Sequence, residues 1–320
     1  MGVAAVRAVY CKTLLNRTDV PGMPFRWSLN PYRGCSHACN YCFARPTHQF
    51  GGPDAGREFE QRVFAKVNAP QVLCQELSRP QWHREPIIIG TASDPYEPAE
   101  AEYLLTRRIL QVLAEFENPA AITTKGVLVR RDVDVLRDLG RVADVRVIFS
   151  VGSIDERVWR LTEPGAPDPW ARLEAMQFLV ENGISAGVVM APLLPGISDS
   201  SQSIDAVAAA AASHQAQFLE ANLLFLNPGS REGFMPSLGE AYPPPGPGLR
   251  QVVPQNLRAP GVQEQRAEGG RGGAAKMGTA GQCTVAVGAG SPAAATTRSE
   301  RVKVRHRRWR RGGRGGSSAQ

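Results

Sequence analysis

The chain has 320 residues, of which 42% are hydrophobic and 21% charged, with six cysteines and a formal net charge of +7. This length allows one large domain or two ordinary ones. The sequence contains no run of 18 or more apolar residues, so we expect no membrane span. Six unevenly spaced cysteines are too few for a disulfide framework in a chain this long, so we expect a reducing, cytoplasmic location.

Strand-like and helix-like segments alternate from Pro24 to about Phe234, after a short lead-in of residues 1–22. The strand candidates are mostly short, apolar and rich in β-branched residues, as buried parallel strands are. They are Phe25–Asn30, Pro86–Thr91, Ala120–Thr124, Val145–Val151, Ile184–Ala191 and Phe218–Phe225. The helix candidates between them are Ala69–Leu77, Ala101–Glu115, Asp132–Leu139, Pro169–Asn182 and Ser201–Ser213.

This alternation predicts an α/β fold with a parallel sheet. Six strand–helix units favour a partial (β/α)6 TIM-like barrel of parallel strands, built by a core domain of residues 23–242. In such barrels the chemistry takes place at the C-terminal ends of the strands. The residues that follow each predicted strand are therefore the candidates for an active site.

The composition changes abruptly after Tyr242. Residues 243–320 are dominated by Gly, Ala, Arg, Pro and Ser and have no periodicity, which predicts a disordered tail. Between Arg298 and Arg314 nine basic residues and one acid give a net +8, so the rest of the chain carries a net −1. The tail is interpreted as a nucleic-acid-binding arm in which Trp309 stacks on bases, as a solvated charge run, or as out-of-frame sequence.

Three cysteines stand close together directly after the first predicted strand. Cys35, Cys39 and Cys42 have the spacing C-x3-C-x2-C, and three thiolates can hold three irons of a cubane [4Fe–4S] cluster. The fourth iron is then open to a small molecule. A structural zinc site needs four ligands, so it would require a histidine such as His37 or His48 as the fourth. Both kinds of metal site are open at this point.

Tyr41 precedes the last of these cysteines, as in the C-x3-C-x-Φ-C signature, where Φ is aromatic. The sequence resembles the radical S-adenosylmethionine (radical SAM) superfamily. Within it the chain is most similar to the spore photoproduct lyase-like branch, especially to mycobacterial and other actinobacterial members of unassigned substrate. The resemblance runs from about Cys11 to about Phe234. It is carried by Met23–Cys35, Tyr41–His48, Thr91–Pro98, Thr123–Asp132, Leu161–Gly165 and Ala191–Gly196.

The resemblance implies an enzyme of lyase or oxidoreductase type whose substrate the sequence does not identify. Its open iron would chelate S-adenosylmethionine, and one electron would cleave this cofactor to methionine and a 5′-deoxyadenosyl radical that abstracts hydrogen from the substrate. A flavodoxin- or ferredoxin-type electron donor is the expected partner. The alternatives are a nucleic-acid-binding protein with a structural metal site and an Arg-rich tail, and an inactive, decayed or misframed enzyme.

By the same resemblance, Tyr41 would lie near the adenine of S-adenosylmethionine. Many relatives bind the methionine amino group with a Gly-Gly-Glu stretch after the second strand, where this chain reads Gly90-Thr-Ala-Ser-Asp94. Thr91, Ser93 and Asp94 are the expected replacements for the missing glutamate. Asp94 is equally interpreted as a turn former before Pro95.

Residues at the ends of the next strands complete the predicted cofactor site. Lys125 would meet the cofactor carboxylate as a point charge, or is an ordinary surface lysine. Ser150 would contact the ribose, or caps the turn that follows it. Ala191–Gly196 would contact the adenine through its backbone, or forms only a proline-bounded turn.

Several other residues are expected to support the site. Arg33, Arg45 and His48 surround the cysteine loop, where they would tune the cluster, contact the substrate or tie down loop carbonyls. Glu163 and Arg172 are predicted to form a structural pair beneath the barrel mouth. Residues 90–97 lack the cysteine that spore photoproduct lyase uses as hydrogen donor, so repair of DNA photoproducts is not expected. Cys74 is predicted to be a buried apolar residue on a helix.

Overall fold

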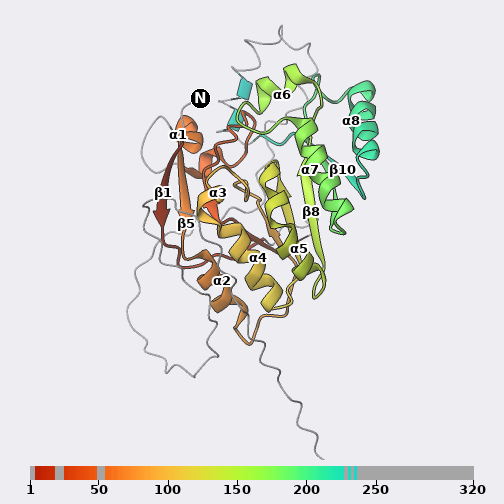
Figure 1. Cartoon of the computed structure of the whole chain (residues 1–320). Coiled ribbons are helices and arrows are strands. Elements are labelled where there is room, and N and C mark those ends of the chain that lie inside the picture. The colour runs from red at the N-terminus through yellow and green to blue at the C-terminus, as the bar shows by residue number, and fades with distance from the viewer. Residues whose placement is uncertain (1–3, 19–24, 49–54, 227–229, 232–233, 236–320) are drawn as a thin grey trace, which may run out of the picture. The chain divides into compact units, whose positions relative to one another are not determined.

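The structure is a computed structural model that describes residues 4–18, 25–48, 55–226, 230–231 and 234–235. Its largest sheet has seven strands in the order β10-β9-β8-β7-β6-β3-β2 (Figure 1). Six of these strands run parallel to their neighbours, and β2 (Asn16–Arg17) pairs antiparallel with β3 at one edge. The parallel strands are β3 (Trp27–Leu29), β6 (Ile87–Ile89), β7 (Ala120–Thr124), β8 (Val145–Ser150), β9 (Ser185–Leu193) and β10 (Leu219–Leu223).

All six predicted strands are present, and the predicted partial (β/α)6 TIM-like barrel of parallel strands is confirmed. The curved sheet stays open because β3 and β10 lie far apart in the strand order. In-register pairing, such as Ala120 with Val145 and Thr124 with Phe149, brings the C-terminal ends of neighbouring strands to one edge. The residues that follow the strands are therefore close in space.

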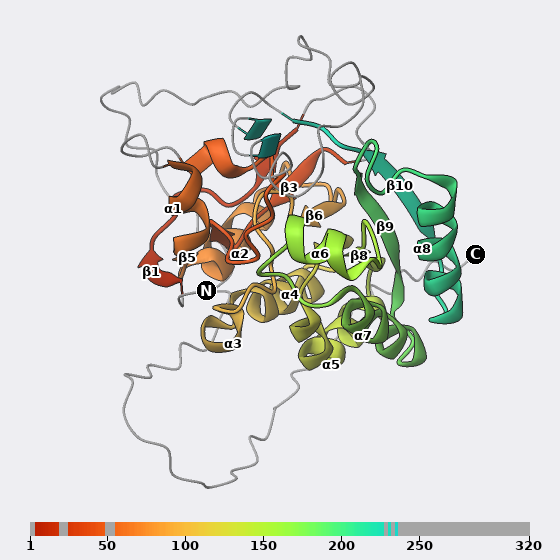
Figure 2. The same cartoon turned by 90° about the horizontal axis from the view of Figure 1, so that it is seen from above.

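The helices between the strands cover the outer side of the curved sheet (Figure 2). Helices α4, α5, α7 and α8 form this outer row, and α7 packs against β8 and β9. The helices are α1 (Ala55–Gln61), α2 (Ala69–Leu77), α3 (Glu100–Tyr103), α4 (Leu105–Glu115), α5 (Val133–Gly140), α6 (Glu156–Thr162), α7 (Pro169–Glu181) and α8 (Ser201–Ser213). Two 3-10 segments, η1 (Arg45–His48) and η2 (Val127–Asp132), complete them.

The core lies between the sheet and these helices. Apolar side chains of the strands, such as Ile87, Ile122 and Phe149, are completely buried, as are Leu110 and Leu136 from the helices facing them. Burying side chains of this size stabilises the fold by about 1.5–3 kcal/mol each. The packed layer thus provides a rigid support for the residues at the strand ends.

The predicted helix Ala101–Glu115 is wrong in one respect, because it is two helices. Leu104 ends α3 with a φ of 53° and so separates it from α4. The buried carboxylate of Glu100 accepts hydrogen bonds from the backbone N–H groups of Thr106 and Arg107 at the start of α4. Four N–H groups at a helix start lack partners within the helix, so this side chain favours a new helix start at that point.

The sequence patterns did not reveal a second, three-stranded sheet. It has the order β1-β5-β4 and consists of β1 (Ala5–Val9), β5 (Arg62–Lys66) and β4 (Tyr32–Arg33). One of its strands lies in the predicted lead-in and the other two flank the cysteine loop. Cys74 lies on α2 and is buried, as expected.

No helix of the described part is long and apolar enough to cross a membrane. The predicted disordered tail, residues 243–320, lies outside the described residues.

Candidate active site

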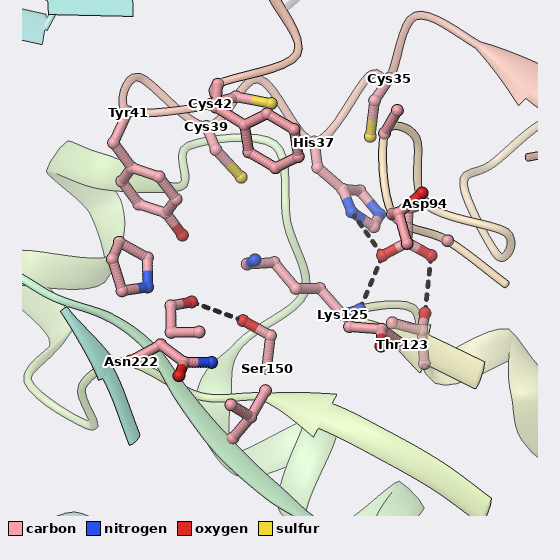
Figure 3. A pocket seen from close by; sticks show the side chains of 18 of the residues that line it. Cys35, His37, Cys39, Tyr41, Cys42, Asp94, Thr123, Lys125, Ser150 and Asn222 are labelled. Atoms are coloured by element: carbon pink, nitrogen blue, oxygen red, sulfur yellow. Dashed lines mark hydrogen bonds and ion pairs between the residues drawn. The ribbon is translucent and has the colours of Figure 1, made fainter. Parts of the chain in front are cut away.

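A cavity of about 290 Å³ lies at the C-terminal ends of the parallel strands. The individual side chains predicted for the cluster or the cofactor all line it: Cys35, Cys39, Tyr41, Cys42, Thr91, Ser93, Asp94, Lys125 and Ser150. Of the predicted segment Ala191–Gly196, only Ala191 and Pro192 do so. Figure 3 shows the three sulfur atoms along one side of this cavity, with the Lys125 side chain pointing towards them from the opposite side. These nine residues come from four separate segments, which are thus brought together as the barrel prediction required.

The three cysteines lie on one loop, between β4 and η1. Burial raises the pKa of the Cys39 thiol to about 12, which the nearby Lys125 ammonium only partly offsets, and burial also raises the pKa of Cys42. Buried thiols of this kind ionise readily only when a metal binds them. Of the cysteines that the structure describes, no others line the cavity, since Cys11 and Cys74 lie elsewhere.

This donor set fits a cluster held by three thiolates better than a zinc ion. Within the described ranges no three His, Cys, Asp or Glu side chains converge where one metal ion could bind. The thiolates of a cubane bind different irons and need not converge. His37 is committed elsewhere, because its Nδ1 lies 3.3 Å from Asp94 Oδ2, and the His48 side chain is outside the described part. The side chains that the structure describes therefore do not form a Cys3His site.

The Asp94 carboxylate is held by four groups of the protein itself. Oδ1 accepts hydrogen bonds from the Tyr96 N–H at 2.9 Å and the Thr124 hydroxyl at 2.6 Å. Oδ2 accepts one from the Lys125 N–H at 2.7 Å and also faces His37. Burial alone would raise the pKa of Asp94, but His37 and these hydrogen bonds hold it at about 2. Asp94 thus joins the end of β7 to the loop after β6 and to the cysteine loop.

His37 lies inside the cysteine loop and is almost completely buried. Burial alone would lower its pKa, but the Cys35 sulfur and the Asp94 carboxylate outweigh burial and raise the pKa well above its ordinary value. The imidazole therefore acts as a hydrogen-bonding link between the loop and Asp94.

The loop after β6 is held by Asn30, which directly follows β3. Asn30 Oδ1 accepts hydrogen bonds from the N–H groups of Ala92 and Ser93, at 2.8 and 3.2 Å, and its Nδ2 donates to the Thr91 hydroxyl at 3.2 Å. The Ser93 hydroxyl in turn donates to the Tyr32 carbonyl at 2.8 Å. Backbone and hydroxyls of this loop are thus fixed at the cavity wall. Asn30 was missed as a supporting residue because its partners are about 60 residues away in the chain.

Lys125 points into the site and is not an ordinary surface lysine, since its side chain is only 14% exposed. Its Nζ lies 3.7 Å from Glu163 Oε1 and 5.7 Å from the centroid of the Tyr41 ring. Burial alone would lower the pKa of Lys125, but the negative charges of Glu163 and Cys39 raise it. The ammonium is therefore a cation at neutral pH, and it faces the cavity.

Glu163 and Arg172 form the predicted pair, with Arg172 Nη2 2.5 Å from Glu163 Oε2. The same carboxylate accepts a hydrogen bond from the Tyr41 hydroxyl. Burial would raise the pKa of Glu163, but the charges of Arg172 and Lys125 and the Tyr41 hydrogen bond lower it. The pair is thus structural as expected, and it also contacts two residues of the predicted cofactor site.

The segment Leu161–Gly165, which comprises the last two residues of α6 and the three that follow, docks on the cysteine loop and is called the strap here. Asn40 donates from its backbone N–H to Thr162 O at 2.9 Å and from its side chain to Leu161 O at 2.6 Å. The Gly165 N–H donates to His37 O at 3.1 Å. A Cβ on Gly165 would lie 2.2 Å from Ser36 O, so only glycine allows this close approach.

The other predicted residues have assigned places. Arg45 Nε donates to Cys39 O at 2.9 Å and Nη2 lies 2.6 Å from Glu60 Oε2, which agrees with a role in tying down the loop. The Ser150 hydroxyl donates to Ala191 O at 2.9 Å, across to β9. Arg33 lies on β4 and is not among the residues that line the cavity.

The sequence analysis missed the wall of the cavity that β10 provides. Asn222, Leu223 and Phe225 line the cavity at the end of that strand. A signal was present, because Asn222 is a polar residue within the predicted strand Phe218–Phe225. No resemblance to the family assigned it a role.

Comparisons with known proteins identify the family of the chain. Residues 29–206 match the family model described as the Radical SAM superfamily. An uncharacterized protein of Mycobacterium tuberculosis is 39% identical over 236 residues, which cover 73% of this chain and 69% of the relative. An uncharacterized protein of Methanocaldococcus jannaschii is 27% identical over 194 residues, or 60% of this chain and 68% of the relative.

A solved structure shows the same fold. It is a mutant of spore photoproduct lyase with bound AdoMet and dinucleoside spore photoproduct, and it aligns with a TM-score of 0.57 at 15% identity. The alignment covers 74% of this chain and 67% of that protein. At this identity the likeness concerns the fold alone.

Proposed function

Since the chain belongs to the radical SAM superfamily of enzymes, we propose that Cys35, Cys39 and Cys42 bind a [4Fe–4S] cluster and that the cavity beside them binds S-adenosylmethionine. One observation carries the proposal: three thiols of one loop face the C-terminal ends of five parallel strands across one cavity. A cavity of this kind, with a few convergent polar groups, is typical of a cofactor site.

When bound, the two cofactors supply a one-electron cleavage that produces a radical able to take a hydrogen atom from a substrate. The protein binds, orients and shields them. Lys125 offers a buried positive charge for the cofactor carboxylate, and the backbone and hydroxyls of residues 90–93 line the opposite wall. Because Asp94 is held by four protein groups, it shapes this wall, and Thr91 and Ser93 remain as the nearby hydroxyl ligands.

Several side chains shield the cysteine loop from water. Phe234 is buried and packs edge-on against Tyr41, with ring centroids 6.3 Å apart, and Ser230 donates a hydrogen bond to Cys42 O at 2.8 Å. Exclusion of water protects reactive intermediates from side reactions. The one electron would come from a flavodoxin- or ferredoxin-type protein.

Anaerobic reconstitution with iron and sulfide tests the proposal. The wild-type protein is expected to become brown, to contain close to four irons, and to form 5′-deoxyadenosine from S-adenosylmethionine under a strong reductant. Cys39→Ala is expected to stay colourless and inactive, because two thiolates do not hold the cluster. Cys11→Ala, a cysteine away from the cavity, is the matched control and should behave like the wild type.

The contrary outcome is specific. A wild-type protein that takes up zinc but no iron, or that holds iron yet forms no 5′-deoxyadenosine, contradicts the proposed function.

A further inference from the structure

Glu163 contacts Tyr41, Lys125 and Arg172, yet it does not line the cavity. One of its carboxylate oxygens accepts the Tyr41 hydroxyl and lies 3.7 Å from Lys125 Nζ. Tyr41 belongs to the cysteine loop and Lys125 follows β7, so a single oxygen relates these two elements to each other. Glu163 therefore acts on the cavity only through the two side chains in front of it.

Arg172 fixes the other carboxylate oxygen from behind. Its side chain is 0% exposed, and it donates to Pro167 O at 2.8 Å and to Ser150 O at 2.9 Å besides pairing with Glu163. A planar guanidinium held by several acceptors has a defined position. Glu163 is thus anchored to α7 and to the end of β8, and it does not need Lys125 as its counter-ion.

The charges near this anchor do not cancel. Two cations, Arg172 and Lys125, accompany the single anion Glu163, and Lys125 is the one that reaches the cavity. Buried charges are costly unless they are paired, so one positive charge at the wall favours an anionic group in the cavity. A carboxylate of a bound ligand satisfies this need.

The side chain of Glu163 is also separable from the docking of the strap. The strap is attached to the cysteine loop by Asn40 and by the Gly165 N–H, and these hydrogen bonds use backbone atoms of residues 161, 162 and 165 and of His37. They do not involve the carboxylate. A change confined to the Glu163 side chain can therefore alter Tyr41 and Lys125 while the strap stays docked.

We propose that Glu163 is a positioning residue, which sets Tyr41 and Lys125 at a fixed separation so that Lys125 meets the carboxylate of S-adenosylmethionine. This inference rests on the proposed function. Arg172 holds Glu163 in place and is part of the same unit.

Glu163→Asp tests the position of the carboxylate while keeping its charge. The shorter side chain still neutralises Arg172 but moves away from Tyr41 and Lys125. We expect the dissociation constant for S-adenosylmethionine to rise about tenfold, equal to about 1.4 kcal/mol, with iron content and melting temperature close to those of the wild type. Glu156→Asp is the matched control, because Glu156 lies on α6 and forms an exposed pair with Arg160.

A double-mutant cycle shows whether Glu163 acts through Lys125. In a Lys125→Met background, Glu163→Asp should weaken binding by much less than tenfold, since contacting residues are not additive. If Glu163→Asp does not fold, Glu163→Gln/Arg172→Gln removes both charges of the Glu163–Arg172 pair together, so neither of these two residues is left as an unpaired ion. The same loss of affinity is expected for that variant.

The outcomes separate the two claims. A wild type that binds no S-adenosylmethionine overturns both the inference and the proposed function. The positioning role alone is overturned in two cases, in both of which the wild type binds S-adenosylmethionine. In the first, Glu163→Asp binds it as tightly as the wild type. In the second, Glu163→Asp weakens binding by the same factor in the wild-type and Lys125→Met backgrounds.

Discussion

Asp94 shows how a side chain at a cavity wall can be occupied by the protein itself. Its two oxygens meet three hydrogen-bond donors and His37, from the cysteine loop, from its own loop and from the end of β7. The hydrogen bond from the Tyr96 N–H agrees with a turn former, while contact with the cofactor stays a prediction. The carboxylate joins three elements, and such a network is fully satisfied only when it is ionised.

Replacing Asp94 by Asn should destabilise the protein strongly. The amide of the variant keeps one acceptor oxygen. Its NH2 group replaces the other oxygen and so faces hydrogen-bond donors that the carboxylate accepts in the wild type. We expect the free energy of unfolding to fall by about 3 kcal/mol, which is typical of a broken buried hydrogen-bond network. Chemical denaturation of the cluster-free protein measures it, with Asp138→Asn, an exposed residue on α5, as the control. An unchanged midpoint would contradict the network.

The same carboxylate predicts a pH dependence. The pKa of Asp94 is about 2 in the folded protein, below its ordinary value, so its stabilising effect is complete above the unfolded pKa and is lost as the pH falls. Between pH 6 and pH 3 the wild type should lose about 1 kcal/mol of stability that Asp94→Asn does not lose. If the free energies of unfolding of the two proteins change in parallel with pH, the predicted role of the Asp94 carboxylate is wrong.

The family resemblance and the positions of residues at strand ends identified much of the lining of the cavity, but neither its β10 wall nor the partners of each side chain. Lys125 and Ser150 could be predicted because they follow strands, and strand ends meet in a parallel barrel. The contact of Glu163 with Tyr41 spans 122 positions in the chain. Pairings at such distances depend on the packing of α6 and α7, which no local pattern contains.

At the level of elements, the strap explains why one glycine is required. Gly165 is packed against the backbone of the cysteine loop, and an added Cβ would also lie 3.0 Å from the carbonyl carbon of His37. Backbone on both sides of this contact leaves no flexible side chain that could move aside.

Gly165→Ala should therefore reduce iron binding. We expect the strap to detach from the cysteine loop, with a loss of a few kcal/mol in stability, as overpacking typically costs about 1–3 kcal/mol. Iron content after reconstitution and thermal melting are the measurements. Gly140→Ala is the control, because its added Cβ would meet only a side-chain atom of Val145 at 3.4 Å. Equal iron content in both variants would show that the strap is not needed.

Elements that depend on local periodicity were predicted well, and elements set by tertiary contacts were not. Helices α2 and α8 have the predicted bounds. The break at Leu104 depends on the buried Glu100 side chain, and Leu itself gives no signal for a φ of 53°. The strand β1 is largely exposed and forms only by pairing with β5, more than 50 residues later.

For the whole molecule, six strand–helix repeats determined the architecture because alternation of this kind has few stable arrangements. Among the residues that the structure describes, those that line the cavity lie between Cys35 and Phe225. The last described residue that packs against the cysteine loop is Phe234.

Deleting residues 243–320 should thus leave the site intact. We expect unchanged iron content and unchanged affinity for S-adenosylmethionine. If the tail is a nucleic-acid-binding arm, salt-dependent binding of the full chain to nucleic acid should be lost, since the deleted part carries the +8 region. Metal analysis and binding at two salt concentrations test both statements. Loss of iron in the shortened chain would assign the tail a role in the site.

The docking of the strap also has a consequence for the time at which the metal can be loaded. Leu161 and Glu163, which hold the cysteine loop, are synthesised 121 and 122 residues after their partners Asn40 and Tyr41. Synthesis at about 5–20 residues per second needs on the order of ten seconds to reach them, and during this time the cysteine loop lacks these contacts. We therefore expect an ordered maturation, in which synthesis first reaches α7, the cysteine loop then takes its shape, and the proposed cluster is bound last.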